Sequence, residues 1–161
     1  MKANFTETFI TDNGTIKNET HKMVELPFSR VSARAIIVRQ KDGAILGTLH
    51  RKNGKYALPG GAIEDNEKAE DAILRELQEE NITLIDSVDG WHERVSVDYF
   101  GGYQELSVWY LFVVIDADIK PCEENIETRW IDQDEDAWYP LMKEKILLAI
   151  CRHTPELIKS H

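Results

Sequence analysis

The chain has 161 residues, of which 42% are hydrophobic and 30% charged, a composition typical of one soluble globular domain. Its formal net charge is −10, and no clustered basic stripe offsets it, which argues against binding to a nucleic acid polymer. No apolar run approaches the roughly 20 residues that span a bilayer. The N-terminus also lacks the apolar core of a signal peptide, so we expect a cytoplasmic protein without a membrane partner.

The N-terminal part predicts a β-hairpin. Strand-forming residues 6–10 and 15–17 flank residues 12–14, Asp-Asn-Gly, and Asn-Gly accepts the positive φ angles of a tight turn. Residues 20–26 are expected to continue the second strand. We therefore expect one domain over residues 1–161 with a hairpin extension at about 1–28. Such a hairpin either extends the main sheet or covers a partner subunit, so a monomer and a homodimer both remain open.

Two strands are predicted next. Residues 31–38 read as a buried strand, a turn at 41–43 reverses the chain, and residues 44–49 form the second strand. The loop at 50–55 contains the densest basic group in the chain, which comprises His50, Arg51, Lys52 and Lys55. This group either binds phosphate or is a solvated hairpin tip.

A loop with two glycines leads into a helix. Gly60 and Gly61 allow positive φ angles and a close approach of the backbone to a ligand. Asp65 or Asn66 is expected to cap the helix, with Glu67 inside the first turn, where a carboxylate suits the positive end of the helix. The residues that follow have high helix propensity.

Three glutamates, Glu76, Glu79 and Glu80, share one face of this helix, because positions i, i+3 and i+4 are neighbours. Like charges at this spacing repel, and a hard divalent cation removes the repulsion. Mg²⁺ and Mn²⁺ prefer carboxylate and carbonyl oxygens, and the carbonyl of Gly60 lies near the start of the helix. The residues thus predict a cation site, and the alternative is a solvated acidic face.

The remainder of the chain predicts further strands and a last helix. Residues 83–85 and 91–100 look extended, and the long apolar run at 106–115 is typical of a central strand. Tyr139-Pro140 is expected to open the last helix, and Pro155 to end it or to begin a short second turn. The expected packing face of the helix consists of Leu141, Ile146, Leu147 and Ile150.

The spacing of the acids resembles the signature of the Nudix hydrolase family, Gly-x5-Glu-x7-Arg-Glu-U-x-Glu-Glu-x-Gly-U, where U is a bulky aliphatic residue. The matching positions are Gly61, Glu67, Arg75, Glu76, Leu77, Glu79 and Glu80. Ile82 stands where the family has Gly, and Thr83 stands where it has an aliphatic residue. The helix is therefore expected either to run one turn longer or to end through Asn81 in a left-handed conformation.

The resemblance implies an α/β fold, an α/β/α sandwich with a mixed central sheet. It implies a hydrolase that uses Mg²⁺, or Mn²⁺, to cleave a diphosphate bond in a nucleoside diphosphate linked to another group: a dinucleoside polyphosphate, a nucleotide sugar or a nucleoside triphosphate. Glu76 and Glu80 would be the primary metal ligands, with Glu79 and the Gly60 carbonyl completing the site. Glu76 or Glu124 would serve as base, and Arg75 would pair with Glu67. The alternative is a module that senses a nucleotide without cleaving it. Isomerisation of an allylic diphosphate would need a reactive Cys, and neither Cys122 nor Cys151 lies near the signature.

Residues outside the signature are assigned by the same resemblance. In similar proteins a basic residue at the end of the strand predicted here at residues 44–49 often contacts the substrate. This favours Arg51, whose planar guanidinium suits phosphate oxygens. Tyr99 is close to the position in the chain at which some family members that cleave dinucleoside polyphosphates carry a tyrosine. Residues 121–131 resemble the family loop that ends in Glu-x-x-Trp, from which a glutamate reaches the metal. Glu124 and Glu127 both qualify; we expect Glu124 in catalysis and Glu127 against the substrate, and the alternative is a solvated loop.

Overall fold

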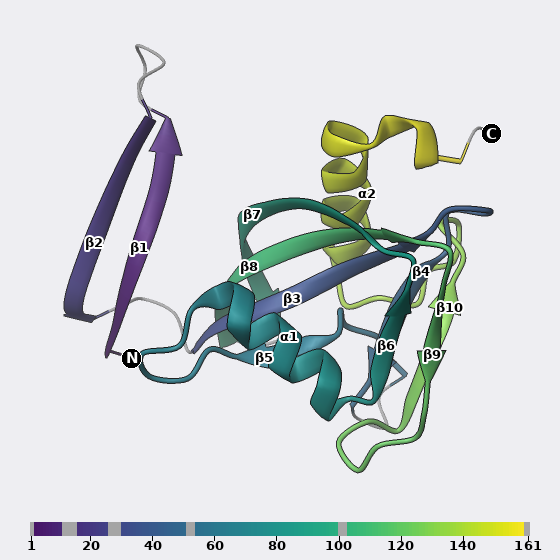
Figure 1. The fold of residues 1–161 in the computed structure, drawn as a ribbon, viewed down its shortest axis with the longest axis horizontal. Helices are drawn as coiled ribbons and strands as arrows, with labels where there is room; N and C mark the ends of the chain where they lie inside the picture. Colours follow the sequence, from purple (N-terminus) through teal and green to yellow (C-terminus); the bar gives the residue numbers. More distant parts are fainter. Residues whose placement is uncertain (1, 11–15, 26–29, 51–53, 100–102, 160–161) are drawn as a thin grey trace.

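The computed structural model describes residues 2–10, 16–25, 30–50, 54–99 and 103–159, with the backbone alone for residues 2–30 and 88–105. The elements in chain order (Figure 1) are β1 (Lys2–Ile10), β2 (Ile16–Glu25), β3 (Arg30–Arg39), β4 (Ile45–Leu49), β5 (Gly60–Ala62), α1 (Ala69–Glu79), β6 (Ile82–Ile85), β7 (Val88–Tyr99), β8 (Tyr103–Val114), β9 (Asp116–Ile119), β10 (Glu127–Ile131), α2 (Met142–His153) and the 3₁₀ helix η1 (Pro155–Leu157). No helix in these ranges is long and apolar enough to cross a membrane.

The central sheet is mixed. Its strands follow the order β10-β4-β3-β8-β7, and β5 pairs with β3 beside this path. β3 and β8 are parallel, whereas the other pairs of this sheet are antiparallel. Helix α1 lies against one face of the sheet and α2 against the other (Figure 1). The predicted α/β/α sandwich and the central position of the run at 106–115 are confirmed.

β3 is apolar on both faces because each face supports a separate core. Ile36 and Val38 pack on the side of α2, together with Ile146 and Ile150. Ala33, Ala35 and Ile37 alternate with them and pack on the side of α1, together with Ala72, Ile73 and Leu77. This alternation is the period of two that a strand imposes. A strand covered on both faces is largely apolar, as expected for the buried strand predicted at residues 31–38, and the buried polar residues of this strand are Ser32 and Arg34.

The predicted N-terminal hairpin is present. β1 and β2 pair antiparallel from Lys2 opposite Glu25 to Ile10 opposite Ile16, and they form a two-stranded sheet of their own. Among the described residues, the hairpin therefore does not pair with the main sheet and does not extend it. The Asp-Asn-Gly turn lies outside the described residues, and contact of the hairpin with a partner subunit stays a prediction.

The last helix starts two residues later than predicted, at Met142. Leu141, expected in the packing face, has a φ of 66° and is 66% exposed. The reason is that Tyr139 is held against Tyr56, whose carbonyl oxygen accepts a hydrogen bond from the Tyr139 N–H at 3.1 Å. The helix can begin only beyond that contact, and Met142 takes the buried position instead. Ile146 and Ile150 are buried, as predicted, and Leu147 packs against the same core.

The first helix ends through Asn81, which is one of the two endings expected from the sequence. α1 stops at Glu79, and Asn81 adopts a left-handed conformation with a φ of 56°. Ile82, which stands where the signature has Gly, begins β6 and lies opposite Ile119 of β9. A side chain is accepted at that position because the left-handed turn is made one residue earlier.

Candidate active site

The Gly60-Gly61 pair forms strand β5 rather than the expected loop. Gly60 lies opposite Arg34 of β3 and has a φ of 143°, and a Cβ there would collide with the carbonyl oxygen of Ala33. A Cβ on Gly61 would lie 2.5 Å from Oε1 of Glu76. Glycine at these two positions lets β5 pair closely with β3 and lets a helix carboxylate reach the strand backbone.

The loop between β5 and α1 lacks the predicted cap. The N-cap residue is Lys68, without a side-chain hydrogen bond, and Asn66 instead makes a left-handed turn with a φ of 63°. Glu67 precedes the helix rather than lying in its first turn. Its carboxylate accepts hydrogen bonds from the backbone N–H of Glu64 at 3.1 Å and from Nε of Arg75 at 2.8 Å. The loop carboxylate is thus bound to a guanidinium and to the loop backbone.

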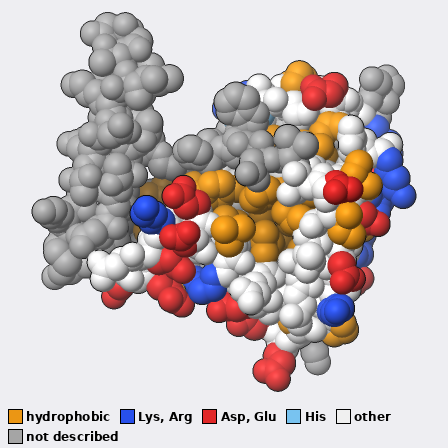
Figure 2. Space-filling view, viewed as in Figure 1, with side chains coloured by type: hydrophobic (Ala, Val, Ile, Leu, Met, Phe, Trp, Pro, Cys, Tyr) orange, Lys and Arg blue, Asp and Glu red, His pale blue; other side chains and the backbone are white. Residues whose placement is uncertain are grey.

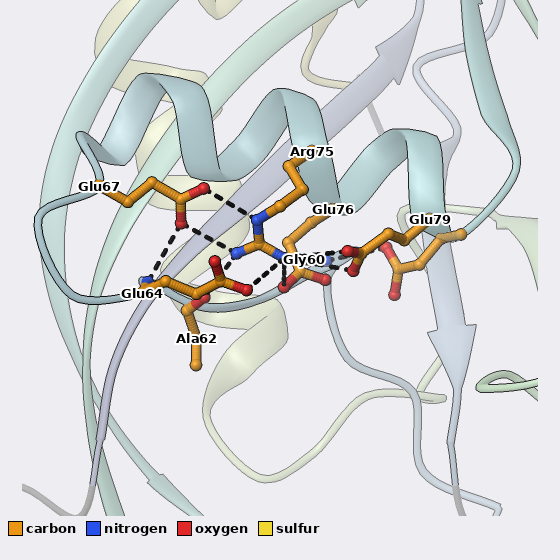
Figure 3. A network of polar contacts seen from close by, with 8 residues as sticks. Gly60, Ala62, Glu64, Glu67, Arg75, Glu76 and Glu79 are labelled. Carbon is orange, nitrogen blue, oxygen red and sulfur yellow. Dashed lines mark hydrogen bonds and ion pairs between the residues drawn. The ribbon is translucent and has the colours of Figure 1, made fainter.

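Arg75 connects this loop to the acidic face of α1 (Figure 3). Its guanidinium donates to Glu67, to the Ala62 carbonyl oxygen at 3.0 Å, to Glu76 Oε1 at 3.0 Å and to Glu79 Oε2 at 3.2 Å. The predicted pair between Arg75 and Glu67 is confirmed. The hydrogen bonds from Arg75 lower the pKa of Glu67. A planar fork with five donors suits this arrangement, because one side chain fixes carboxylates from two segments.

Three carboxylates meet at the end of α1. Glu76, Glu79 and Glu124 each offer an oxygen atom, and these atoms all lie within 4.8 Å of one another. Glu76 is buried, whereas Glu79 and Glu124 are exposed. Burial raises the pKa of Glu76, the Arg75 guanidinium lowers it, and the carboxylates of Glu79 and Glu124 raise it again. Figure 2 shows further acidic side chains over α1, so the negative charge here exceeds what Arg75 neutralises.

Glu80 lies apart from this cluster, although the sequence placed it there. It is 1% exposed. Its Oε2 accepts a hydrogen bond from the Gly60 N–H at 3.1 Å, and its Oε1 accepts one from Nδ2 of Asn125 at 3.4 Å. Burial raises the pKa of Glu80 to about 8, against the opposing effects of Asn125, the Arg34 charge and Gly60. Glu80 therefore joins three segments: β5, the end of α1 and the loop before β10.

Two residues of this site were missed by sequence reasoning. Arg34 is buried on β3 and donates through Nη1 to the carbonyl oxygen of Leu58 at 2.8 Å. The sequence pattern that could have identified Arg34 is a charged residue inside the apolar run at 31–38. Asn125 had no signal, because an amide in a polar loop is common. Its Oδ1 is buried and has no hydrogen-bond partner in the described part of the chain.

The residues present fit a hard divalent cation. The donor set consists of carboxylate oxygens from α1 and from the loop before β10, which are the ligands that Mg²⁺ and Mn²⁺ prefer. The described cluster contains neither imidazole nor thiolate. The unpartnered Oδ1 of Asn125 adds one more oxygen atom beside Glu80.

The other predicted site residues are Glu127, Arg51 and Tyr99. Glu127 lies on β10, where its Oε2 accepts a hydrogen bond from the Tyr56 hydroxyl at 2.6 Å. Arg129 covers the Tyr56 ring, with 4.8 Å between the guanidinium carbon and the ring centroid. Of the two loop acids, the structure thus brings Glu124 to the cluster and binds Glu127 to a tyrosine. Arg51 lies outside the described residues, and Tyr99 ends β7, where the backbone alone is described.

Comparison with known proteins gives consistent matches. The model of the NUDIX domain family matches residues 29–148. An ADP-ribose pyrophosphatase of Methanocaldococcus jannaschii is 32% identical over 99 residues, which are 58% of this chain and 57% of that protein. This chain thus spans little more than half the length of that curated relative.

Solved structures share the fold. The structure of a MutT protein from Methanosarcina mazei Go1 superimposes with a TM-score of 0.59 at 22% identity, over 76% of this chain and 93% of the other. An Ap4A hydrolase from C. elegans gives a TM-score of 0.58 at 18% identity, over 76% and 98% of the two chains. At these identities the likeness shows the fold alone.

Proposed function

Because this chain belongs to the Nudix family, we propose that it hydrolyses a diphosphate bond in a small phosphorylated molecule, a nucleoside diphosphate linked to another group. The observation that carries the proposal is the group of three carboxylates, Glu76, Glu79 and Glu124, at the end of the signature helix. The names of the related ADP-ribose pyrophosphatase and of the Ap4A hydrolase refer to substrates of this class. Nucleotide sugars and nucleoside triphosphates contain the same bond.

The cofactor in this proposal is Mg²⁺, with Mn²⁺ as the alternative. Glu76, Glu79 and Glu124 would hold it. Glu80, which is a primary ligand in the expectation from the sequence, and the Gly60 carbonyl would complete the site. Such an ion supplies positive charge beside the phosphate oxygens and makes water more acidic. Oxygen ligands and the excess negative charge at the cluster support this choice.

The side chains of the cluster have separate roles in this reaction. Arg75 fixes Glu76 and Glu79 in place through its hydrogen bonds. Glu76 and Glu124 are the two candidates for the base that takes a proton from the attacking water. Glu124 is the better candidate, because it is exposed, whereas Oε1 of Glu76 already accepts a hydrogen bond from Arg75.

Arg51, Tyr99 and Glu127 are the proposed substrate contacts. Arg51→Ala should raise KM more than it lowers kcat, because a phosphate contact made in the ground state contributes to binding. Lys41→Ala is the matched control, since it removes an exposed positive charge from another turn. An unchanged KM in Arg51→Ala would remove this residue from the binding site. We further propose a cytoplasmic monomer or homodimer without nucleic acid or membrane partners.

The test is hydrolysis of a panel of dinucleoside polyphosphates, nucleotide sugars and nucleoside triphosphates with Mg²⁺, followed by identification of the products. Glu124→Gln should lower turnover by orders of magnitude while the protein stays folded. Glu123→Gln is the matched control, since it removes a neighbouring exposed carboxylate that is not part of the cluster. Binding of a nucleotide without any product would instead indicate a sensing module.

A further inference from the structure

The loop between β9 and β10, residues 120–126, carries Glu124 and is joined to the end of α1 at its first residues. Nδ2 of Asn81 donates a hydrogen bond to the carbonyl oxygen of Pro121 at 2.8 Å. The backbone N–H of Lys120 donates to the carbonyl oxygen of Asn81 at 3.1 Å. A single residue of the helix end therefore makes both a donor and an acceptor contact with the start of the loop.

The conformation of Asn81 makes these contacts possible. Its φ of 56° reverses the chain after α1, so that Ile82 pairs with Ile119 and the start of the loop lies beside the helix end. Glycine and asparagine tolerate this left-handed conformation better than other residues. Glycine would satisfy the backbone requirement alone, whereas asparagine adds the amide that reaches Pro121.

The loop needs such a contact because its carboxylate, Glu124, lies beside two other carboxylates. Glu124 lies within 4.8 Å of carboxylate oxygens of Glu76 and Glu79, and this repulsion acts to push the loop away from α1. At the other end of the loop, the N–H of Ile126 donates to the carbonyl oxygen of Leu49 at 2.7 Å. The loop is thus bound at both ends, with Glu124 between the two contacts.

We propose that Asn81 is a positioning residue, whose side-chain amide holds the Glu124 loop against α1 so that the three carboxylates already lie together in the metal-free protein. The inference rests on the proposed function, because it matters only if the cluster binds a cation. A site arranged in advance binds its ion more tightly, since the loop loses less conformational freedom on binding. Asn81 is not part of the carboxylate cluster and acts through Glu124.

The test is calorimetric titration of the metal-free protein with Mn²⁺. Asn81→Gly keeps the backbone conformation and removes the amide, and we expect it to weaken Mn²⁺ binding about three- to tenfold, the equivalent of one net hydrogen bond. Asn66→Gly is the matched control. Asn66 has a similar φ of 63°, and no hydrogen bond of its side chain is seen among the described residues.

A double-mutant cycle separates this role from a general structural one. In a Glu124→Gln background, Asn81→Gly should cause no further loss of affinity, because the group that it positions no longer carries a charge. Equal losses in both backgrounds, or wild-type affinity in Asn81→Gly, would overturn the positioning role. If Glu124→Gln alone bound Mn²⁺ as the wild type does, the proposed cation site would fail, and the role of Asn81 with it.

Discussion

Glu80 shows how the surroundings of one residue change its chemistry. The helix spacing groups it with Glu76 and Glu79, yet its carboxyl is buried between Gly60 and Asn125. Burial is the largest effect on its pKa and raises it to about 8. Burial therefore favours the neutral form of this carboxyl in the metal-free protein. A neutral Glu80 beside Glu76 also reduces the repulsion that two charged carboxylates would have.

This shift predicts a pH dependence of stability. An acid whose pKa is higher in the folded chain than in the unfolded chain stabilises the fold at low pH, and the free energy of unfolding falls as pH rises between the two values. For Glu80 these values are 4.5 and about 8. We predict that Glu80→Gln removes this contribution, which is at most about 1.4 kcal/mol per pH unit. Urea unfolding of the metal-free protein across this range measures it.

The control for that experiment is Glu70→Gln, which removes an exposed carboxylate from the same helix. Its stability curve should run parallel to that of the wild type across the pH range. If the curve of Glu80→Gln ran parallel as well, the carboxyl of Glu80 would not have a raised pKa.

Gly61 gives a second prediction for a single residue. In Gly61→Ala the new Cβ would lie 2.5 Å from Oε1 of Glu76, so the carboxylate or the strand has to move. We expect a loss of about 1–3 kcal/mol in the free energy of unfolding, as for other overpacked sites. In a Glu76→Ala background the carboxylate is absent, and the same substitution should cost much less. Urea unfolding of the four proteins would disprove the clash if both backgrounds lost equal stability.

Among the elements, α1 depends on Arg75 more than on a cap. The sequence predicted a side-chain cap at Asp65 or Asn66, but the helix begins at Ala69 without one. Arg75 instead binds the loop carboxylate of Glu67 through two hydrogen bonds, at 2.8 and 2.9 Å. The loop and the helix are therefore fixed by a contact eight residues apart, which cap rules do not describe.

Arg75→Lys tests that contact. A lysine keeps the charge but cannot donate in two directions from a plane, so we predict a loss of about 1–3 kcal/mol in the free energy of unfolding. Arg152→Lys is the control. It makes the same change at an exposed residue of α2, where substitutions usually change the free energy of unfolding by no more than about 0.5 kcal/mol. Urea unfolding compares the two variants, and an equal or smaller loss for Arg75→Lys would contradict its role.

The candidate site could be predicted in part at this scale. Helical spacing correctly placed Glu76 and Glu79 together, because both lie inside α1. It failed for Glu80, which is the C-cap residue with a ψ of 4°, so its side chain follows the strand contact rather than the helix face. Glu124 was found through family resemblance, since no local pattern relates a loop residue to a helix more than 40 residues before it.

Across the whole molecule, the sheet was predicted best where its strands are long and apolar. β3 and β8 carry such patterns and form the parallel pair at the centre. β5 was missed because glycines signal a loop, and its pairing depends on the neighbouring backbone of Ala33 and Arg34. β9 was missed because it has only four residues, two of which are Asp, a residue depleted in strands. Strand order and parallel pairing depend on contacts distant in the chain; the family resemblance supplied the mixed sheet, and the order of its strands was not predicted.

An anomalous-difference map from crystals of this protein grown with Mn²⁺ tests the three-carboxylate cation site itself. We expect a peak about 2.0–2.2 Å from carboxylate oxygens of Glu76, Glu79 and Glu124. A map with no peak at these side chains, or with its strongest peak elsewhere on the chain, would show that they do not hold the cation.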